Sequence, residues 1–563
     1  MRPALLDGDT LGEGLGNLAR AAPGAVAAFP AARDQITALK LATASAGSAH
    51  AFLEAGIQPG ELVGVLPATD ARFLVTIFAL WRAGAAVSVL PAEAGFGDNS
   101  AAARRLARLV EATGMRHLVL DPSYQPLGQL LHDLVPRLTI LDPGAAGAGT
   151  APGKLPSVEP DSLAIVQFTS GSTSAPKGVM LPHRGVMAGL RACVVSGAFS
   201  PDDVFVQWVP TFHDMGLIGL LSHWLNGADV HAFTPVAFLR RPERLLEYFA
   251  EHRGTVLTGP NFSYDFLLDA IAPDRLAALD LSSWRLAFNG AEPVSAATVR
   301  RFTEALAGSG VSESVMYPVY GMAEATLSVS YPRPGEAPRI TTVDRNELGA
   351  CGTVRCLPGV GPGAKEVVSV GRPVHGIAVR IRAEDGNCPA GRLGEIQIRG
   401  TAVTSGYYGD PAASGALFDG GWLCTGDLGF QLNGDLYVTG RRKEMIIVRG
   451  QNFFPEDVEA IAREVPGVYR RRCVAFAEED GAGSESAGVI VEATGPADEV
   501  RAEVTRRVAA ELGLARVHVH VVKPRWLTRT TSGKWQRMLA AKRITDSAAG
   551  NLSADTETDV PPA

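Results

Sequence analysis

The stretch Gln167-Phe-Thr-Ser-Gly-Ser-Thr-Ser-Ala-Pro-Lys-Gly-Val-Met180 gathers hydroxyl groups, glycines and one lysine into a short loop after an apolar run. We expect residues 164–166 to form a buried strand, and Gly171 lets the turn that follows bring backbone NH groups close to an anion. Lys177 adds a positive charge that can follow a phosphate as it moves. Four hydroxyl side chains can donate hydrogen bonds, those of Thr169, Ser170, Ser172 and Thr173. This combination favours a loop that binds phosphate.

Two features of this loop leave its role open. A Walker A loop has a Gly-Lys pair followed at once by Ser or Thr, whereas here Gly178 follows Lys177. The composition of the loop, taken by itself, favours a polar surface turn. The rest of the chain must therefore decide between the two interpretations.

Length and charge indicate a protein of several domains that does not bind polyanions in general. At 563 residues the chain is too long for one core, and the usual sizes of domains predict roughly two to four units. The net charge is -7, and no basic stripe is interleaved with aromatic residues. These features argue against a nucleic-acid partner, so any affinity for phosphate must come from a local arrangement of donors.

The cysteines and the N-terminal residues predict a cytosolic location. Six cysteines include one C-x4-C pair, Cys351 and Cys356, with no matching cluster of His or Cys nearby, which favours free thiols over a metal site. Acidic residues within positions 1–25 interrupt the apolar core that a signal peptide would need. The apolar run at 73–90 contains Arg82 and suits a helix leading into a buried strand better than a membrane span.

The hydrophobic pattern predicts an α/β fold. Strand-like runs alternate with amphipathic helical ones over residues 61–66, 71–83, 86–90, 101–113 and 117–120. This alternation is typical of parallel sheets covered by helices. A linker rich in Gly, Ala and Pro spans 144–156, a β-rich stretch spans 395–438, and an α+β unit follows Gly440.

We therefore expect three parts of the chain. Residues 1–440 form a large N-terminal domain, in which helix-covered sheets are followed by the β-rich subdomain, and residues 441–545 form a small C-terminal domain. Residues 546–563 are rich in Ser, Asp, Thr, Glu and Pro and are expected to form a disordered tail.

Five separated segments resemble, in order, the motifs of the adenylate-forming superfamily of acyl-CoA synthetases, luciferases and peptide-synthetase adenylation domains. The segments are the loop at 169–178, Tyr320-Gly-Met-Ala-Glu324, Trp422-Leu-Cys-Thr-Gly-Asp427, Gly440-Arg-Arg-Lys-Glu444 and Thr531-Ser-Gly-Lys534. They resemble the family's phosphate loop, its adenine and magnesium motif, its ribose motif, its hinge and its catalytic-lysine loop. The resemblance covers roughly residues 20 to 542 and implies ATP and Mg²⁺ as cofactors.

Within the superfamily the sequence is most similar to the fatty acyl-AMP ligases, which pass acyl groups to carrier proteins. The segments that carry this resemblance are Phe212-His-Asp-Met-Gly-Leu217, Phe238-Leu-Arg-Arg-Pro242, Phe288-Asn-Gly-Ala-Glu-Pro293 and Ile447-Val-Arg-Gly-Gln-Asn-Phe-Phe-Pro455. Extra sequence at 343–365 resembles in position an insertion by which these ligases differ from acyl-CoA synthetases. A functionally neutral surface insertion remains the alternative.

The resemblance assigns roles to charged residues. Glu324 is expected to ligate Mg²⁺, and Asp427 to accept hydrogen bonds from the ribose hydroxyls. Lys177 is expected to hold phosphate, and Lys534 to reach the α-phosphate and the carboxylate as the catalytic lysine. Arg441 is expected to contact the ribose or the phosphates.

Uncharged residues and one histidine complete the expected site. Tyr320, with Gly321 and Met322, is expected to pack on adenine, while Asn289, Gly290, Ala291 and Glu292 line the base and the acyl channel. His213 is expected to act at the acyl carbonyl, with a structural histidine as the alternative. Two residues depart from the family pattern, Ser174 in the phosphate loop and Trp535 after the catalytic lysine.

The expected reaction is the activation of a carboxylic acid to acyl-AMP, followed by transfer to a phosphopantetheine thiol. Because no carrier segment follows the small domain, we expect a separate acyl carrier protein as the partner. The resemblance also implies that the small domain moves between the two steps about a hinge at Lys443. The sequence does not give the acyl chain, because the pocket depends on side chains such as Trp208 and Phe262 in three dimensions.

Three other functions stay open. An acyl-CoA or aryl-CoA synthetase would share the five motifs and use CoA as the acceptor. The interpretation as an amino-acid-activating domain is less favoured, because His213 stands where such a domain would have an acidic residue to bind the ammonium group of its substrate. A paralogue that binds acyl-adenylate or nucleotide without turnover is disfavoured, because Lys534, Glu324 and Asp427 are all present.

Overall fold

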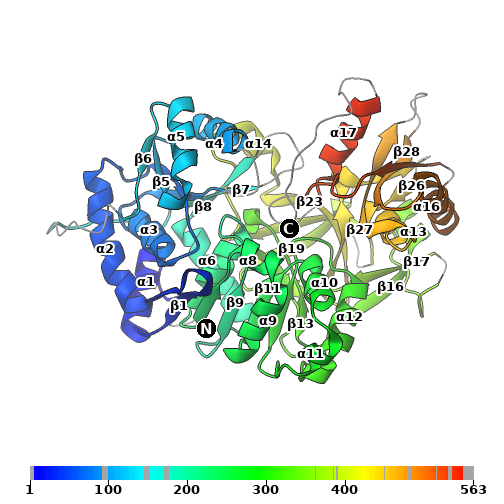
Figure 1. Cartoon of the computed structure of the whole chain (residues 1–563), viewed down its shortest axis with the longest axis horizontal. Coiled ribbons are helices and arrows are strands. Elements are labelled where there is room, and N and C mark those ends of the chain that lie inside the picture. Colours follow the sequence, from blue (N-terminus) through cyan, green and yellow to red (C-terminus); the bar gives the residue numbers. More distant parts are fainter. Residues whose placement is uncertain are drawn as a thin grey trace.

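The computed structural model describes residues 6–91, 99–144, 153–169, 176–361, 363–383, 386–387, 391–448, 451–479, 485–514, 516–529 and 535–548. Figure 1 shows the N-terminal part in blue and cyan on the left and the C-terminal part in orange and red on the right, with the middle of the chain between them. The expected α/β fold is confirmed. Within the described residues, no helix is long and apolar enough to cross a membrane.

The first sheet carries the phosphate-loop candidate on its edge hairpin. Its strand order is β6-β5-β3-β4-β7-β8. The strands are β3 (Leu62–Leu66), β4 (Ala86–Val89), β5 (His117–Leu120), β6 (Thr139–Leu141), β7 (Leu163–Thr169) and β8 (Lys177–Pro182). Neighbours from β6 to β7 run parallel, and β8 returns antiparallel to β7. Every residue of β3, β4 and β5 is buried, as expected for parallel strands covered on both faces.

Helices accompany this sheet and the N-terminus of the chain. They are α1 (Leu11–Ala21), α2 (Ala38–Glu54), α3 (Ala71–Arg82), α4 (Asn99–Thr113) and α5 (Gln125–Leu134). The helix α1 begins with a capping box, in which Thr10 accepts from the backbone NH of Glu13 and the Glu13 side chain accepts from the backbone NH of Thr10. The helices expected at 71–83 and 101–113 are confirmed as α3 and α4.

The second sheet has seven strands in the order β13-β12-β11-β9-β10-β1-β2. The strands are β1 (Val26–Phe29), β2 (Asp34–Thr37), β9 (Val204–Gln207), β10 (Asp229–Ala232), β11 (Val256–Gly259), β12 (Leu286–Asn289) and β13 (Met316–Pro318). The helices of this region are α6 (His183–Ser196), α7 (Asp214–Trp224), α8 (Pro235–Arg240), α9 (Pro242–Glu251), α10 (Asn261–Ala270), α11 (Pro273–Ala277) and α12 (Ala296–Leu306). Only β2 pairs antiparallel among the strands of this sheet, so the carboxyl ends of β9, β11 and β12 meet at one edge.

The β-rich stretch forms an antiparallel sheet that supplies the expected ribose motif. It contains β19 (Ile377–Ala383), β20 (Gly386–Asn387), β21 (Gly394–Gly400), β22 (Phe418–Asp419), β23 (Trp422–Leu432) and β24 (Asp435–Arg441), with α14 (Pro411–Ala416) before β22. A small sheet of β14 (Tyr320–Gly321), β15 (Ser328–Tyr331) and β18 (Arg372–Pro373) precedes it. The turn predicted at Asn433 and Gly434 joins β23 to β24, and both residues have positive φ, of 54° and 83°.

Residues 446–548, which we call the C-terminal unit, have a core of their own. The unit contains β25 (Ile446–Val448), β26 (Gln451–Phe453), α15 (Pro455–Ala462), β27 (Val468–Glu479), β28 (Glu485–Ala493), α16 (Ala497–Leu512), β29 (Val517–Val522) and α17 (Arg537–Ala548). The strand expected at 517–522 is β29 with the same bounds. The helix α17 continues to Ala548, so residues 546–548 are helical rather than part of a tail, and residues 549–563 lie outside the described residues.

The sequence at 343–365 forms a structured arm that contacts the C-terminal unit. It contains the end of β16 (Ile340–Asp344), the helix α13 (Arg345–Cys351) and the start of β17 (Ala364–Val368). Lys365 Nζ lies 2.7 Å from Asp457 Oδ1 of α15, and 3.9 Å from the ring centroid of Phe454. Asn452 Nδ2 donates to Gly349 O at 3.1 Å. These contacts fix the arm against the C-terminal unit.

Candidate active site

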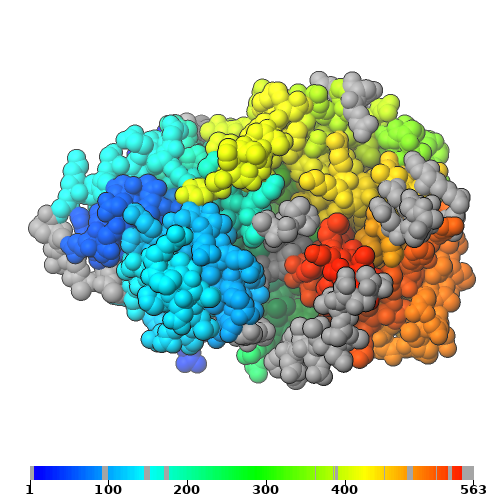
Figure 2. Space-filling view, turned by 90° about the horizontal axis from the view of Figure 1, so that it is seen from above, coloured from blue at the N-terminus to red at the C-terminus, as the bar shows by residue number. Residues whose placement is uncertain are grey.

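A cavity of about 2490 Å³ opens between the carboxyl edge of the second sheet, the β-rich sheet and the C-terminal unit. Seen from above, the red and orange C-terminal unit faces the blue and cyan N-terminal part across a hollow (Figure 2). The cavity is lined by the expected site residues Thr169, Lys177, His213, Ala291, Glu292, Tyr320, Gly321, Met322, Glu324, Asp427 and Arg441. Residues far apart in sequence therefore meet in one site.

Asp427 lies at the centre of a polar cluster on one wall of the cavity. Tyr320 donates its hydroxyl hydrogen to Asp427 Oδ2 at 2.7 Å, and Arg441 Nε lies 3.0 Å from Asp427 Oδ1. The pairing of β23 with β24 sets Asp427 opposite Arg441. The charge of Asp427 raises the pKa of Arg441, and burial raises the pKa of Tyr320 well above its usual value, so Tyr320 stays a neutral donor. Each Asp427 oxygen has a second lone pair with which it can accept a hydroxyl hydrogen.

Glu324 lies in a second cluster, next to the edge of the first sheet. It sits in a short 3₁₀ turn, Ala323–Ala325, and its Oε1 accepts a hydrogen bond of 3.0 Å from the Tyr407 hydroxyl. Lys177 Nζ lies 4.6 Å from the centroid of the Tyr407 ring. Burial raises the pKa of Tyr407, and the nearby charge of Glu324 raises it further. The phenol thus links the expected metal ligand to the expected phosphate-binding lysine.

Tyr407 was not predicted from the sequence. A backbone ladder holds it in place: Met180 N donates to Gly406 O at 3.1 Å, and Tyr408 N donates to Gly178 O at 2.7 Å. The Thr404 hydroxyl donates to Met180 O at 2.6 Å. The only signal in the sequence is a pair of tyrosines between Gly406 and Gly409, which predicts a turn and nothing about its partners.

The phosphate-loop candidate is described only at its two ends. Thr169 and Lys177 face each other across the β7–β8 hairpin, and the Thr169 hydroxyl lies 3.5 Å from Lys177 O. A Cβ at Gly178 would lie 2.8 Å from Val166 Cγ1, so only glycine fits beside Lys177. Ser170, Gly171, Ser172, Thr173 and Ser174 lie outside the described residues, and Lys534 does as well.

The side chain of Asn261 fixes the turn after β12 through hydrogen bonds. Asn261 Oδ1 accepts from Asn289 Nδ2 and from Ser295 N, each at 3.0 Å, and Asn261 Nδ2 donates to Pro293 O at 2.8 Å. Asn289 is fully buried and Gly290 packs against Val319, so neither lines the cavity, whereas Ala291 and Glu292 do. The role of Asn289 is therefore to anchor the turn that presents Glu292. Asn261 was not predicted, because its partners are distant in the sequence.

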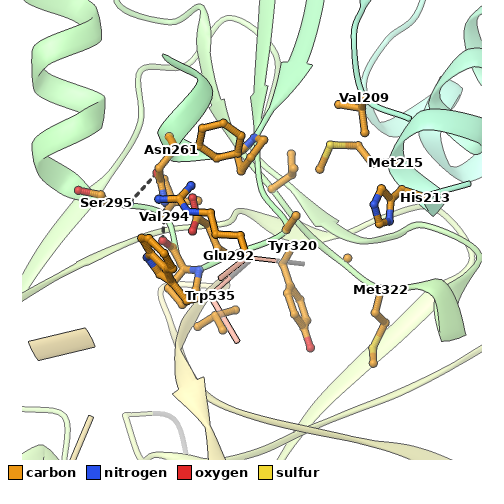
Figure 3. Close-up of a pocket in the computed structure, with 18 of the residues that line it drawn as sticks. Val209, His213, Met215, Asn261, Glu292, Val294, Ser295, Tyr320, Met322 and Trp535 are labelled. Atoms are coloured by element: carbon orange, nitrogen blue, oxygen red, sulfur yellow. Dashed lines mark hydrogen bonds between the residues drawn. The ribbon is translucent and has the colours of Figure 1, made fainter. Parts of the chain in front are cut away.

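An aromatic region of the cavity suits an apolar substrate. Trp208 stacks on Phe238, with ring centroids 4.1 Å apart, and meets Phe262 edge-on at 5.9 Å. Figure 3 shows His213, Met215 and Val209 on the same side of this pocket, opposite Trp535. His213 immediately precedes α7 as its cap residue, and Gln167 Nε2 donates to Phe212 O at 2.6 Å, which fixes this segment over the first sheet.

Trp535 reaches the cavity from the C-terminal unit. The centroid of its ring lies 4.0 Å from the guanidinium carbon of Arg529 and 5.5 Å from that of Arg472. The ring also packs against an apolar cluster that includes residues of β27 and β28. The packing of this residue, which departs from the family pattern, could not be predicted from the sequence. Lys443 lines the cavity as well, from the turn after β24.

The donor set of the site fits a metal ion only in part. The described residues contain no group of three or more His, Cys, Asp or Glu that could hold an ion by themselves. Glu324 is the single expected ligand, and one of its oxygens already accepts from Tyr407. This arrangement fits Mg²⁺ that arrives on the phosphates of a nucleotide, since Mg²⁺ commonly uses one or two carboxylates together with substrate oxygens and water.

The fold and this partly apolar site, which has room for a nucleotide and a second substrate, define a class of enzyme. Residues 17–408 match the family model for AMP-binding enzymes, and the chain belongs to this family, whose substrate nucleotide is ATP. A medium-chain-fatty-acid–acyl-carrier-protein ligase of Teredinibacter turnerae is 33% identical over 421 residues, which are 70% of this chain and 65% of that protein. A long-chain-fatty-acid–AMP ligase of Mycobacterium marinum is 34% identical over 409 residues, 68% of this chain and 69% of that protein.

A solved structure extends the similarity to nearly the whole chain. It comes from a study of fatty acyl-adenylate ligases from E. coli and L. pneumophila, and it superposes with a TM-score of 0.90 at 30% identity. The alignment covers 97% of this chain and 99% of that one. The expected membership of the adenylate-forming enzymes, and the similarity to fatty acyl-AMP ligases, are confirmed.

Proposed function

We propose that this chain uses ATP to convert a fatty acid to acyl-AMP and then transfers the acyl group to the phosphopantetheine thiol of a separate acyl carrier protein. The observation that carries the proposal is that two polar clusters line the same cavity as the aromatic pocket around Trp208. One cluster is Asp427 with Tyr320 and Arg441, and the other is Glu324 with Tyr407 and Lys177. A nucleotide and an acyl chain can therefore lie in one cavity with their reactive groups between them.

The first step joins the acid to AMP. A carboxylate oxygen attacks the α-phosphorus, a P–O bond forms, and the bond to the bridging oxygen breaks so that pyrophosphate leaves. Negative charge grows on the phosphoryl oxygens, so fixed cations and donors accelerate this step. Thr169, Lys177 and the loop residues Ser170, Gly171, Ser172 and Thr173 would hold the departing phosphates, and Lys534 would approach the α-phosphate.

The nucleoside would be held by the Asp427 cluster. Asp427 would accept hydrogen bonds from the ribose hydroxyls, with Arg441 beside it, and the ring of Tyr320 would pack on adenine between Gly321, Met322 and Ala291. Glu324 would hold Mg²⁺ on the phosphates, where the ion neutralises charge on their oxygens. Tyr407 would orient the Glu324 carboxylate and keep Lys177 near it.

The second step needs a thiol as acceptor. The sulfur attacks the carbonyl carbon, a C–S bond forms, and AMP leaves as its phosphate anion while the thiol gives up its proton. His213, at the pocket side of α7, would lie near the acyl carbonyl, and Lys443 would serve as the hinge. We propose the C-terminal unit, with a boundary near residue 440, as the mobile domain. The composition of the chain favours the cytosol as the location.

One experiment tests the proposal directly. The protein is incubated with ATP, Mg²⁺ and a panel of carboxylic acids, and CoA and a phosphopantetheinylated carrier protein are offered in parallel. Intact-mass spectrometry should show acyl-AMP, followed by acylated carrier protein. Acyl-CoA as the main product would identify a synthetase instead, and the absence of acyl-AMP with every acid would favour a nucleotide-binding protein without turnover.

A further inference from the structure

Arg529 and Trp535 form an aromatic and cationic pair on the face of the C-terminal unit that meets the cavity. They pair through an isolated backbone bridge, and the guanidinium carbon of Arg529 lies 4.0 Å from the centroid of the Trp535 ring. Behind them, Trp535 packs against the small core formed by Val474, Phe476, Ile490, Leu527 and Ala540. The pair is therefore anchored to the sheet of the unit and moves with it.

The guanidinium of Arg529 also contacts a residue outside the C-terminal unit. Its carbon lies 4.9 Å from the ring centroid of Phe262, at the start of α10. Glu292 and Val294, which follow β12, line the same cavity as Trp535 (Figure 3). Arg529 thus joins a residue of the C-terminal unit to a residue of the aromatic pocket.

Phe262 connects this contact to the interior of the pocket. It meets Trp208 edge-on at 5.9 Å, and Trp208 in turn stacks on Phe238. A chain of ring contacts therefore runs from Arg529 to the aromatic residues that would surround an acyl chain. Cation–π and aromatic contacts of this kind depend on ring orientation, so a ligand that orders Phe262 also orders the surface on which Arg529 stacks.

We propose that Arg529 and Trp535 complete the wall of the acyl pocket, and that they couple binding of a long acyl chain to docking of the C-terminal unit. This inference rests on the proposed function. Arg529 and Trp535 are positioning residues: Arg529 contacts Phe262, and Trp535 lines the cavity beside Arg529, so neither is assigned a contact with the reacting atoms. A short acid that does not reach Phe262 would leave the docking of the unit unchanged, whereas a long one would strengthen it.

The chain offers a matched control for this contact. Arg543 lies 4.0 Å from the ring centroid of Trp526, which is the same geometry within the same unit. Neither of these two residues lines the cavity. Arg543→Gln therefore removes an equivalent stack without touching the pocket.

The first measurement compares adenylation by wild type, Arg529→Gln and Arg543→Gln over saturated acids from acetate to hexadecanoate. A cation–π contact of the usual strength predicts that Arg529→Gln lowers kcat/KM for long acids by about 2- to 30-fold. Acetate should be affected much less, because it does not reach Phe262. Equal loss for acetate and long acids, or the same effect from Arg543→Gln, would overturn the coupling.

A second measurement does not depend on turnover. Amide hydrogen exchange in peptides covering 526–540 should slow when wild type binds dodecanoate, and Arg529→Gln should remove this protection while Arg543→Gln keeps it. If dodecanoate protects both variants equally, or fails to protect wild type, the inference is wrong. A wild type that shows the protection but makes no acyl-AMP would refute the proposed function and leave the contact established.

Discussion

Replacement of Arg537 by methionine should destabilise the C-terminal unit strongly. Arg537 contacts three carboxylates: Nη1 lies 2.6 Å from Glu444 Oε2, Nη2 lies 3.0 Å from Glu456 Oε1, and Nε lies 2.7 Å from Glu459 Oε1. The side chain of Glu459 is 1% exposed and that of Arg537 is 15% exposed. Methionine would fill much of the space but leave the carboxylates without their shared cation.

The expected loss can be worked from these contacts. Removing one partner of a buried ion pair costs about 3 to 5 kcal/mol. Glu459 keeps Arg463 at 2.9 Å and the backbone NH of Ala475 at 3.1 Å, so the lower figure applies. For a unit of about 100 residues, each kcal/mol lowers Tm by about 4 to 8 °C, which gives a loss of roughly 12 to 24 °C.

The loss should depend on pH in a defined direction. Burial already raises the pKa of Glu456, and the positive charge of Arg537 opposes that shift. Without Arg537 the folded pKa of Glu456 rises further above its unfolded value, so the folded variant binds a proton that the unfolded chain does not. Its stability is then greatest at low pH and falls as pH rises through the folded pKa. The difference from wild type should be larger at pH 7.5 than at pH 5.5.

Scanning calorimetry of the full-length protein at both pH values measures this effect, with amide exchange in β28 and α16 to identify the part that unfolds. Arg506→Met is the matched control, because the exposed Arg506 has Glu503, at 2.7 Å, as its one ion-pair partner among the described residues. An exposed pair of this kind contributes about 0 to 1 kcal/mol. If Arg537→Met lowers Tm no more than Arg506→Met does, or if it lowers Tm more at pH 5.5 than at pH 7.5, the reasoning is refuted.

Three further predictions concern other parts of the molecule. Asp427→Asn should lower kcat/KM for ATP by about 10- to 150-fold, because hydrogen bonds to a charged group contribute about 1.5 to 3 kcal/mol. ATP–pyrophosphate exchange measures this loss, and a change below threefold would contradict the role assigned to Asp427. Burial lowers the pKa of His223 to about 4, so the free energy of unfolding should fall, as pH drops from 6.5 toward 4, by up to about 1.4 kcal/mol per pH unit for this histidine. Urea titrations of wild type and His223→Gln check this, and an unchanged slope in the variant would argue against it. Iodoacetamide should alkylate the exposed Cys351 in the native protein but not the buried Cys473, because burial raises the pKa of the Cys473 thiol to about 12. Peptide mass mapping measures the labelling, and alkylation of Cys473 in the native protein would contradict this prediction.

The alternation of apolar and polar residues predicted the architecture well. The strand β29 has the predicted bounds because Val517-His-Val-His-Val-Val522 alternates and stands between a helix and a turn. The motifs likewise located Tyr320, Asp427 and Arg441, which the structure brings into direct contact. A helix, strand or binding motif can therefore be predicted from the sequence when a few consecutive residues determine it.

Contacts between distant segments could not be predicted in this way. Tyr407 meets Glu324 across 83 positions of sequence, and Asn261 meets Asn289 across 28. Trp535 depends on side chains of β27, and the structured arm depends on Lys365 meeting Asp457. Each of these residues has an ordinary polar or aromatic identity, and its role follows only from which strands become neighbours.

The backbone ladder between β8 and residues 404–408 covers the outer edge of the first sheet, and it also places Tyr407 beside Glu324. Successive side chains along an extended segment point to opposite sides, so a slip of one residue would turn Tyr407 away from Glu324 and present Tyr408 instead. The site should therefore tolerate hardly any change in the length of this segment. Among related chains we therefore expect a one-residue insertion or deletion in this segment to be rarer than a change of side chain at Ala402 or Val403 just before it.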